Sequence, residues 1–399
     1  MKKRVVLISA AALCIIAGIA VFISKNRIKD IDVYGNNNIG INISVADNGQ
    51  DDSQNYWNPD NHNFAKGDGG YYYFYSTGKA QYLYFFDEEA KKSIAVCNKA
   101  DCQHNDETCN AYYADNEYVR DTVYFYKGNL YVVRLHEGMG ILCRMNLENN
   151  GREDIAELFP SDGTGKISLV FCGDAVYAYD SIGHSYSKEE NKEVIKKISL
   201  KYKTAEEIFS FTGVGGSVGY GKCFGGNLFF TARNYSLDMD TAEYTSFTQL
   251  YCYNDLNKEV TKLSDEQILD YYVDIQNERI YYFVLGKGLY RSRLDGTQAV
   301  LLKKADSELV NATVSCDGKY IYLDNAGVGS LTDARARIER YIFVLDMDGN
   351  YVQKIECENC SGVYFGDSRY MFARFSAQQG QYRYIEKSEQ EQFKWKIME

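Results

Sequence analysis

"ATVSCDGKYIYLD", residues 312–324, contains the unit from which the fold can be predicted. Two short apolar runs flank Asp317-Gly318, a dipeptide that favours the tight turn of a β-hairpin. The second run is aromatic and aliphatic, and Tyr322 serves as its reference position. The stretch therefore predicts two adjacent antiparallel strands joined by a tight turn.

The same unit recurs along the chain. The comparable positions are Tyr72, Tyr131, Tyr177, Phe229, Tyr281, Tyr322 and Met371, separated by 59, 46, 52, 52, 41 and 49 residues. Two more strand-like runs follow each of them before the next unit begins. Four strands in a repeat of roughly 40–50 residues are typical of one blade of a β-propeller. We therefore predict an all-β fold, a seven-bladed β-propeller of four-stranded blades, over residues 61–399.

The number of blades and the closure of the ring stay open at this stage. The first copy of the unit is the faintest, so six or eight blades are possible. The run IGINISV, residues 39–45, could add a strand that helps to close the ring. A β-sandwich or a pair of barrels is disfavoured, because those folds do not repeat one four-strand unit with a constant aromatic position.

Composition agrees with β-structure and argues against one class of partner. The 399-residue chain has 36 Tyr and 20 Phe but only 2 Pro, and aromatic residues favour the half-buried faces of sheets. Its net charge is −11, whereas proteins that bind nucleic acid gather Lys and Arg into basic patches. We expect no nucleic-acid partner.

The first 24 residues have the composition of a membrane anchor. Residues 5–24 form a run of 20 without a charge, about 30 Å long as a helix, which is enough to cross the hydrocarbon core of a bilayer. We predict an uncleaved signal anchor over residues 1–24, one transmembrane helix, with a cleaved signal peptide as the alternative. The polar residues 25–60 then form a stalk, and the propeller lies on the extracytoplasmic side of the cell membrane.

"CNKADCQHNDETCNAY", residues 97–112, concentrates sulfur and imidazole. Cys97, Cys102, His104 and Cys109 follow the spacing C-x4-C-x-H-x4-C and could be four tetrahedral ligands of structural zinc. Common zinc sites contain C-x2-C pairs, which this motif lacks, and a disulfide needs only two cysteines with nearby Cα atoms. A disulfide among the three cysteines is therefore favoured, with a zinc ion or free thiols as alternatives. We predict no catalytic residue and no cofactor other than this zinc ion.

The other cysteines fall into two groups. Cys357 and Cys360 form a C-x2-C pair that could be a local disulfide, a redox pair or half of a metal site, and a structural disulfide is favoured. Five more lie inside apolar runs, where a free thiol behaves as a small hydrophobic group. These are Cys143, Cys172, Cys223, Cys252 and Cys316.

Three stretches resemble known families. "VSCDGKYIYLD", residues 314–324, resembles the repeat of TolB-type, WD-like propellers, with Cys316 where that family has Pro. "GLYRSRLDGTQAVLL", residues 288–302, is similar to repeats of related bacterial propellers and of YWTD receptor modules. Residues 97–112 resemble a cysteine motif in exported propeller proteins of gut Firmicutes, many of them lipoproteins and largely of unknown function. The resemblance implies an exported propeller and no particular reaction.

Loop lengths predict where function lies. In a propeller blade with strands A to D, the A–B and C–D turns share one face, and the B–C loops share the other with the links between blades. Three B–C loops are long, at residues 180–193, 234–246 and 324–337, and the cysteine motif is expected in the link from blade 1 to blade 2. Long loops on a rigid scaffold are where binding residues gather.

We therefore expect a membrane-anchored binding module that recognises a protein or a glycan through its long-loop face. One alternative is a polysaccharide hydrolase or lyase with carboxylates around the central channel. Another is a scaffold or sensor subunit of an envelope complex.

Overall fold

The computed structural model describes residues 57, 62–76, 80–147, 151–161, 167–180, 190–237, 244–327, 337–375, 381–387 and 393–399. The predicted anchor, the predicted stalk apart from Trp57, and the run 39–45 lie outside these residues. Within the described ranges, no helix is long and apolar enough to span a bilayer.

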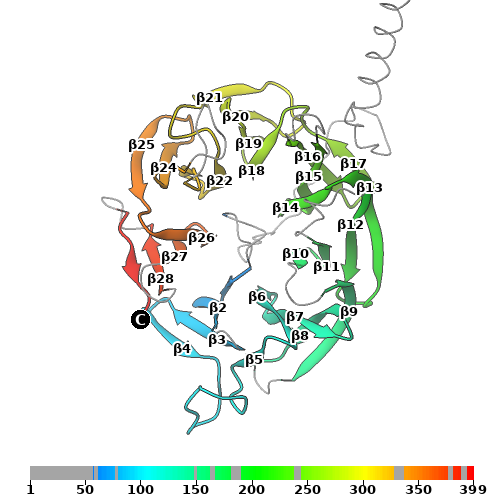
Figure 1. The fold of residues 1–399 in the computed structure, drawn as a ribbon, viewed down its shortest axis with the longest axis vertical. Coiled ribbons are helices and arrows are strands. Elements are labelled where there is room, and N and C mark those ends of the chain that lie inside the picture. The colour runs from blue at the N-terminus through cyan, green and yellow to red at the C-terminus, as the bar shows by residue number, and fades with distance from the viewer. Residues whose placement is uncertain are drawn as a thin grey trace, which may run out of the picture.

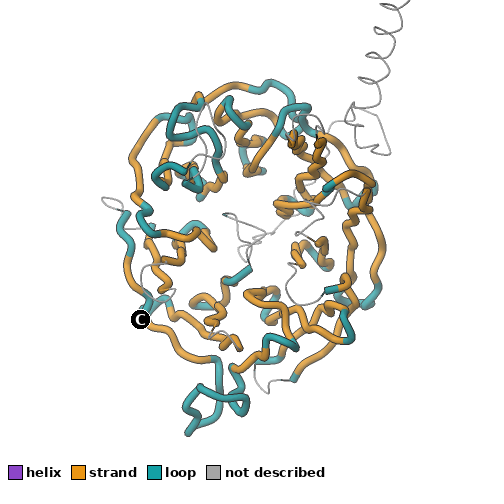
Figure 2. Tube along the Cα trace, viewed as in Figure 1, coloured by secondary structure: helices purple, strands orange, loops and turns teal. Residues whose placement is uncertain are grey.

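The described strands form seven sheets arranged around a central axis (Figure 1), and the described parts of their connections contain no helix (Figure 2). Each sheet has four strands in chain order, A to D from the axis to the rim, and the first sheet has a short fifth strand. The predicted seven-bladed β-propeller is confirmed.

The blades are numbered in chain order. Blade 1 contains β1 (Phe64–Gly67), β2 (Gly70–Ser76), β3 (Ala80–Asp87), β4 (Lys92–Ala95) and β5 (Tyr112–Ala114). Blade 2 contains β6 (Tyr118–Tyr126), β7 (Asn129–His136), β8 (Met139–Met145) and β9 (Arg152–Pro160). Blade 3 contains β10 (Ile167–Cys172), β11 (Ala175–Asp180), β12 (Glu190–Ser199) and β13 (Ala205–Val214). Blade 4 contains β14 (Ser217–Phe224), β15 (Asn227–Leu237), β16 (Tyr244–Asn254) and β17 (Glu259–Lys262). Blade 5 contains β18 (Ile268–Asp274), β19 (Arg279–Val284), β20 (Gly288–Arg293) and β21 (Val300–Lys304). Blade 6 contains β22 (Thr313–Cys316), β23 (Tyr320–Asp324), β24 (Tyr341–Asp346) and β25 (Tyr351–Glu356). Blade 7 contains β26 (Cys360–Gly366), β27 (Tyr370–Phe375), β28 (Gln381–Glu386) and β29 (Lys396–Ile397).

The repeated aromatic position lies on strand B of every blade, from Tyr72 on β2 to Met371 on β27. The faces of strand B pack against the adjacent blades, as the clusters around Phe229 and Tyr322 show. The turn before it has a clear local cause in blade 6. The Asp317 carboxylate accepts the N–H groups of Lys319 at 2.9 Å and Tyr320 at 2.8 Å, which closes the turn between β22 and β23.

Apolar side chains pack between neighbouring blades. Between blades 4 and 5, Phe229 of β15 packs with Tyr271 of β18 and Ile280 of β19 in one buried cluster. Corresponding clusters lie between the other blades, so burial of apolar surface between the sheets holds the ring together.

A buried ion pair ties three blades together at the inner strands. Lys222 on β14 donates to Asp270 on β18 at 2.9 Å, and both side chains are 1% exposed. Asp270 also accepts the backbone N–H of Val314 on β22 at 2.8 Å. Burial raises the pKa of Asp270 to about 6, although Lys222 and the backbone donors favour its ionised form. One carboxylate therefore couples blades 4, 5 and 6.

Two described residues that precede β1 contact opposite sides of the ring. Trp57 is buried and packs against Tyr322 of blade 6, with ring centroids 5.7 Å apart, and against Gly366 of blade 7. Five residues later, Nε2 of His62 lies 3.1 Å from the hydroxyl of Ser168 in blade 3, on the opposite side of the ring (Figure 1). The packed domain thus includes Trp57, which the boundary predicted from the sequence assigns to the stalk.

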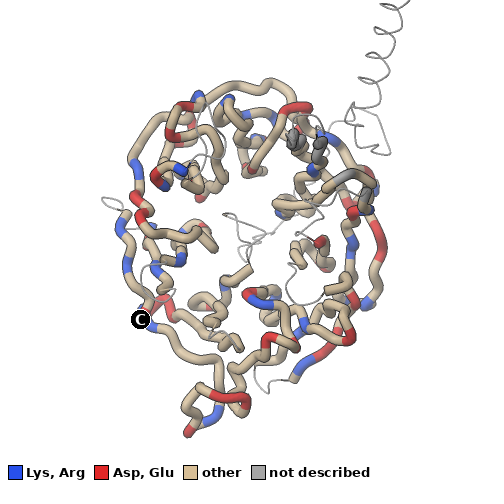
Figure 3. The backbone as a smooth tube through the Cα atoms, viewed as in Figure 1, with Lys and Arg blue, Asp and Glu red and all other residues tan. Residues whose placement is uncertain are grey.

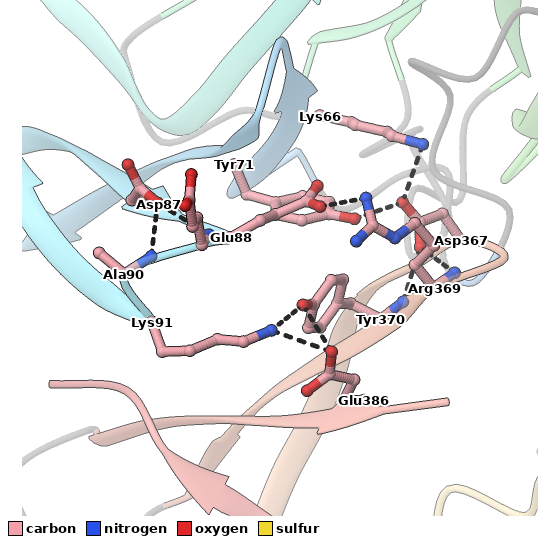
Figure 4. Close-up of polar contacts among 11 residues, drawn as sticks. Lys66, Tyr71, Asp87, Glu88, Ala90, Lys91, Asp367, Arg369, Tyr370 and Glu386 are labelled. Carbon is pink, nitrogen blue, oxygen red and sulfur yellow. Dashed lines mark hydrogen bonds and ion pairs between the residues drawn. The ribbon is translucent and has the colours of Figure 1, made fainter. Parts of the chain in front are cut away.

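Among the described strands, none is shared between blades 7 and 1, where the ring closes. Blade 1 contains only the first strands of the chain, and blade 7 contains only the last ones. Phe64 stacks on Phe372 across this boundary with ring centroids 4.9 Å apart. Nearby, Arg369 forms an ion pair with Glu88 (Figure 4). The backbone N–H of Ser93 on β4 also donates to the carbonyl of Glu399, just after β29, at 2.7 Å. Closure therefore depends on side-chain contacts and on this backbone hydrogen bond.

Tyr71→Phe tests the polar part of this closure. The buried hydroxyl of Tyr71 donates to the Asp367 carboxylate at 2.6 Å (Figure 4). We expect the substitution to lower the free energy of unfolding by about 1.5–2 kcal/mol, because a buried carboxylate loses a donor. Chemical denaturation measures the change, and Tyr202→Phe is the matched control, because Tyr202 is 70% exposed. Equal effects of the two substitutions would contradict the role given to this hydrogen bond.

Two cysteines that the sequence predicts to be free thiols are joined. Cys172 on β10 and Cys223 on β14 form a disulfide with Cα atoms 5.8 Å apart. The prediction is wrong for this pair because the A strands of blades 3 and 4 lie side by side, a proximity that an apolar sequence pattern does not reveal. Cys143, Cys252 and Cys316 are buried free thiols, as predicted.

Candidate functional site

The two faces of the ring differ in their connections. Because the strands in each blade are antiparallel, all A–B and C–D turns lie on one face, the turn face. The B–C loops and the links between blades lie on the other face, the loop face. The three long B–C loops predicted from the sequence begin and end there, and their central parts, 181–189, 238–243 and 328–336, lie outside the described residues.

In blades 3 and 4, two paired outer strands extend beyond the inner strands on the loop face. In blade 4, β15 pairs with β16 as far as Leu237, beyond Arg233, where its pairing with β14 ends. In blade 3, β12 pairs with β13 as far as Glu190, beyond the reach of β11. Gly213 lies against the side chain of Asn234, so the two projecting ribbons touch. They form the largest described elaboration of this face.

The long loop of blade 6 leaves the ring from a fixed base. Asn325 is fully buried, and its amide donates to the carbonyl groups of Glu308 at 2.9 Å and Glu339 at 3.0 Å. Its side-chain oxygen accepts the N–H groups of Gly327 and Tyr341, each at 3.0 Å. Four hydrogen bonds from one side chain hold both ends of the loop in position.

The seven A strands, which lie nearest the axis, contain three carboxylates, Asp121, Asp270 and Asp274. Asp270 is sealed inside the ring by Lys222. Asp274 accepts the N–H of Asn277 at 3.1 Å in the A–B turn of blade 5. Asp121 on β6 is the third of these carboxylates.

Asp121 lies in an irregular part of β6 with a left-handed backbone, φ +54°. That conformation is costly for a residue with a Cβ and often marks a functional position. Its N–H donates to the buried side chain of Gln81 at 2.9 Å. The guanidinium of Arg374, on β27, interacts electrostatically with Asp121 and with Tyr382. These groups come from blades 1, 2 and 7 and form a polar cluster near the inner strands.

The cysteine motif lies on the rim of blade 1, not in the link to blade 2 that the sequence predicts. β4 pairs with the second half of β3, and β5 pairs with its first half in the same direction. They are two halves of one D strand, separated by residues 96–111, which we call the cysteine insertion and which projects outward from the ring (Figure 1). Its two ends meet at Leu83, which bonds to Ala111 at 2.8 Å and to Val96 at 2.9 Å through its backbone.

The four residues predicted as a metal site or disulfide converge within the cysteine insertion. The ligand atoms of Cys97, Cys102, His104 and Cys109 all lie within 4.8 Å of one another. Nδ1 of His104 is 3.4 Å from Sγ of Cys109. The three cysteines are free thiols in the structure.

Cys357 and Cys360 are also close together, at the start of blade 7. Both are free thiols, and the Cys360 N–H donates to the Cys357 carbonyl at 3.0 Å. The hydrogen bond between the thiols lowers the pKa of Cys360 against the effect of burial, with help from the Arg340 guanidinium. Arg340 is itself held by Asp324 through two hydrogen bonds, at 3.0 and 2.5 Å. The pair can form a local disulfide or remain a reduced dithiol.

No family model matches this sequence, and no curated protein matches it either. Solved structures do resemble the fold. A prolyl endopeptidase structure aligns with 87% of this chain at a TM-score of 0.56 and 11% identity, and this chain spans half the length of that protein. An oligogalacturonate lyase from Vibrio parahaemolyticus aligns with 81% of this chain and 85% of its own length, at a TM-score of 0.52 and 10% identity. TolB from Acinetobacter baumannii covers 70% of this chain and 61% of its own at 12% identity, with a TM-score of only 0.40. At these identities the first two likenesses show the propeller fold and nothing about activity.

Asp121 and Arg374 were not among the residues predicted from the sequence. The available signal was the pair Arg120-Asp121, which interrupts an otherwise apolar and aromatic inner strand. Arg374 had no such signal, because arginines are common on outward-facing strand positions, and only the ring brings blade 7 next to blades 1 and 2.

Proposed function

We propose that this protein is an extracytoplasmic interaction module that binds a protein or a glycan through its loop face. Residues 5–24 anchor it in the cell membrane as a single span. The two touching ribbons of blades 3 and 4, raised on the loop face of a rigid ring, are the observation that carries the proposal.

The scaffold favours recognition. The loop bases are fixed by buried groups such as Asn325, so the loops need little ordering of their supports when a ligand binds. On the turn face the same blades have only tight turns, so fewer residues project from that face. A loop-bearing face on a rigid ring is the usual place for a binding surface.

The ligand class is inferred from the charge of the surface. Most of the described Tyr and Phe side chains are buried between the strands, so the aromatic composition reports on the core and does not define the ligand. Charged residues of both signs are spread around the whole ring (Figure 3). This distribution suits a partner with a mixed polar and aromatic surface better than it suits a nucleic acid. A partner subunit in an envelope complex would be one kind of protein ligand.

The second candidate function is a polysaccharide hydrolase or lyase. The observation in its favour is Asp121, strained and close to Arg374 near the inner strands. Against it, the other two carboxylates of the A strands are engaged in structural contacts.

A binding experiment separates the two. The purified ectodomain, beginning at residue 50, is applied to a glycan array and to solubilised membrane proteins. In the test variant, a two-residue Asn-Gly turn replaces residues 235–246, which removes the tip of the blade 4 ribbon. We expect ligand retention to fall at least about tenfold, which corresponds to the loss of one or two well-packed contacts.

The control variant is Tyr202→Ser with Leu256→Ser, on the turn face, where these side chains are 70% and 77% exposed. It should bind as the unmodified protein does. Loss of binding in the control but not in the ribbon variant would place the binding surface on the turn face. Cleavage of a bound polysaccharide that Asp121→Asn abolishes would replace the binding module with the enzyme.

A further inference from the structure

The cysteine insertion has no means of packing by itself. Its central residues, 97–110, contain Ala100 as the one aliphatic side chain, and the rest are polar or are the four residues of the motif. Backbone hydrogen bonds of Leu83 with Val96 and Ala111 tie the segment to the sheet, and its three cysteines pack against Ala80 and Tyr82 of β3. A closed loop of this length without an apolar core needs a cross-link of some kind.

The side chains that point inward are the four of the motif. Across residues 98–108, every residue is exposed except Cys102 and His104. His104 has a left-handed backbone, φ +54°, which is costly for a residue with a Cβ and which accompanies the inward position of its ring. Half-burying these two side chains while exposing their neighbours is the arrangement expected of ligands around a shared centre.

The distances suit one tetrahedral metal ion. Zinc binds thiolate sulfur at about 2.3 Å and imidazole nitrogen at about 2.0–2.1 Å, so tetrahedral ligand atoms lie about 3.5–3.8 Å apart. Nδ1 of His104 lies 3.4 Å from Sγ of Cys109, and all four ligand atoms lie within 4.8 Å of one another. A small inward movement of the side chains would complete the shell.

Backbone amides already point at the sulfurs. The N–H groups of Lys99 and Asn110 donate to Cys97, and the N–H of Ala111 donates to Cys109 at 3.4 Å. Such donors stabilise the negative charge of a metal-bound thiolate and fix its direction. A disulfide sulfur carries no charge and gains little from them.

The number and kind of groups also argue against a disulfide. A disulfide uses two cysteines, whereas all three sulfurs contact one another here. It would leave one thiol and an inward-facing imidazole without a role. A Cys3His set has the composition and the closed geometry of structural zinc sites.

We propose that Cys97, Cys102, His104 and Cys109 bind one Zn²⁺ ion as a closed structural site. Binding releases the three thiol protons to solvent, and three thiolates with one Zn²⁺ give the centre a net charge of −1. The shell leaves no open position, so the ion stabilises the insertion and does no chemistry. With the ion bound, the insertion is a rigid, acidic projection on the rim of blade 1, with Asp101, Asp106 and Glu107 exposed.

The test measures zinc in the purified ectodomain and the protection of the insertion from protease. We expect one zinc per chain by native mass spectrometry and elemental analysis. Removing it with a chelator should speed tryptic cleavage after Lys99 at least about tenfold, because a loop without its cross-link opens locally. Cleavage after Lys258, in a tight turn of blade 4, is the internal control and should not change.

Three variants make the result specific. His104→Ala should lower zinc affinity at least about tenfold, since a ligand is lost. His104→Cys should retain the ion, because four thiolates are also a common zinc shell. Cys360→Ser removes a partly buried thiol outside the cluster and should leave the zinc content unchanged. Because the insertion lies on the rim, circular dichroism should show the ring intact in all three.

Other results would overturn the proposal. An intact mass lower by two hydrogens among these cysteines, without metal, would establish a disulfide. Iron in place of zinc would show that the site serves another metal. Equal zinc content in the unmodified protein and in His104→Ala would show that the ion is bound elsewhere.

Discussion

Lys222→Met is expected to lower the free energy of unfolding at pH 8 by about 3–5 kcal/mol, because it leaves the Asp270 carboxylate buried without its cation. Lys222 is 1% exposed and also donates to the carbonyl of Tyr271 at 2.5 Å. Met has nearly the length of the lysine stem, so the packing changes little and the loss reports on the charge. Chemical denaturation of the ectodomain measures the change.

The loss should depend on pH with a defined sign. Burial raises the pKa of Asp270 to about 6 in the folded protein, above the value of about 3.9 for an exposed aspartate. A group with a raised pKa stabilises the fold fully below its unfolded pKa, and this contribution is lost as the pH rises through the folded pKa. Without Lys222 the folded pKa rises further. The deficit of Lys222→Met should therefore be largest at pH 8 and should shrink toward pH 5.5.

Two controls identify the buried pair as the cause. Lys192→Met removes an exposed partner of Glu207 and should cost less than about 1 kcal/mol. The double variant of Lys222→Met with Asp270→Asn removes both charges and keeps an acceptor for Val314, so it should recover most of the loss. A deficit below 1 kcal/mol at pH 8, or one that does not change with pH, would refute the role of this pair.

An ectodomain that begins at residue 61 is expected to be less stable than one that begins at residue 50, by about 3–5 kcal/mol. The shorter protein lacks Trp57, which is 1% exposed and fills the space between Tyr322 and Gly366. Removing a fully buried tryptophan costs the transfer of its surface and leaves a cavity. Thermal and chemical denaturation of the two proteins measure the difference.

Point variants separate the side chain from the rest of the segment. In the longer protein, Trp57→Ala should reproduce most of the loss, and Trp57→Phe should cost less because a ring still fills part of the space. If the two ectodomains are equally stable, Trp57 does not contribute to the packing of blades 6 and 7.

The repeated unit made the fold predictable because each blade is built from local signals. Asp317-Gly318 predicts a turn, and the Asp317 carboxylate closes that turn in the structure. Apolar runs around Tyr322 predict strands, and these strands are buried between blades. Such signals depend on neighbours in the chain, so a single sequence contains them.

Contacts between segments far apart in the sequence are not indicated by local signals of this kind. The disulfide between Cys172 and Cys223 joins two apolar strands, and nothing in the sequence of either strand indicates that the other lies beside it. Trp57 lies in a polar stretch, where a single tryptophan does not predict burial. The cysteine motif was recognised by its spacing, but its position was misplaced, because the sequence does not show that β4 and β5 are one strand interrupted.

Ring closure without a shared strand has a consequence for the history of such chains. The described strands of each blade come from one continuous stretch of sequence, so duplicating or deleting that stretch adds or removes a complete sheet. In rings where the two ends of the chain complete one common sheet, the same event must preserve a split unit. Here any blade boundary can also serve as a new start of the polypeptide, and circularly permuted versions would keep every sheet whole.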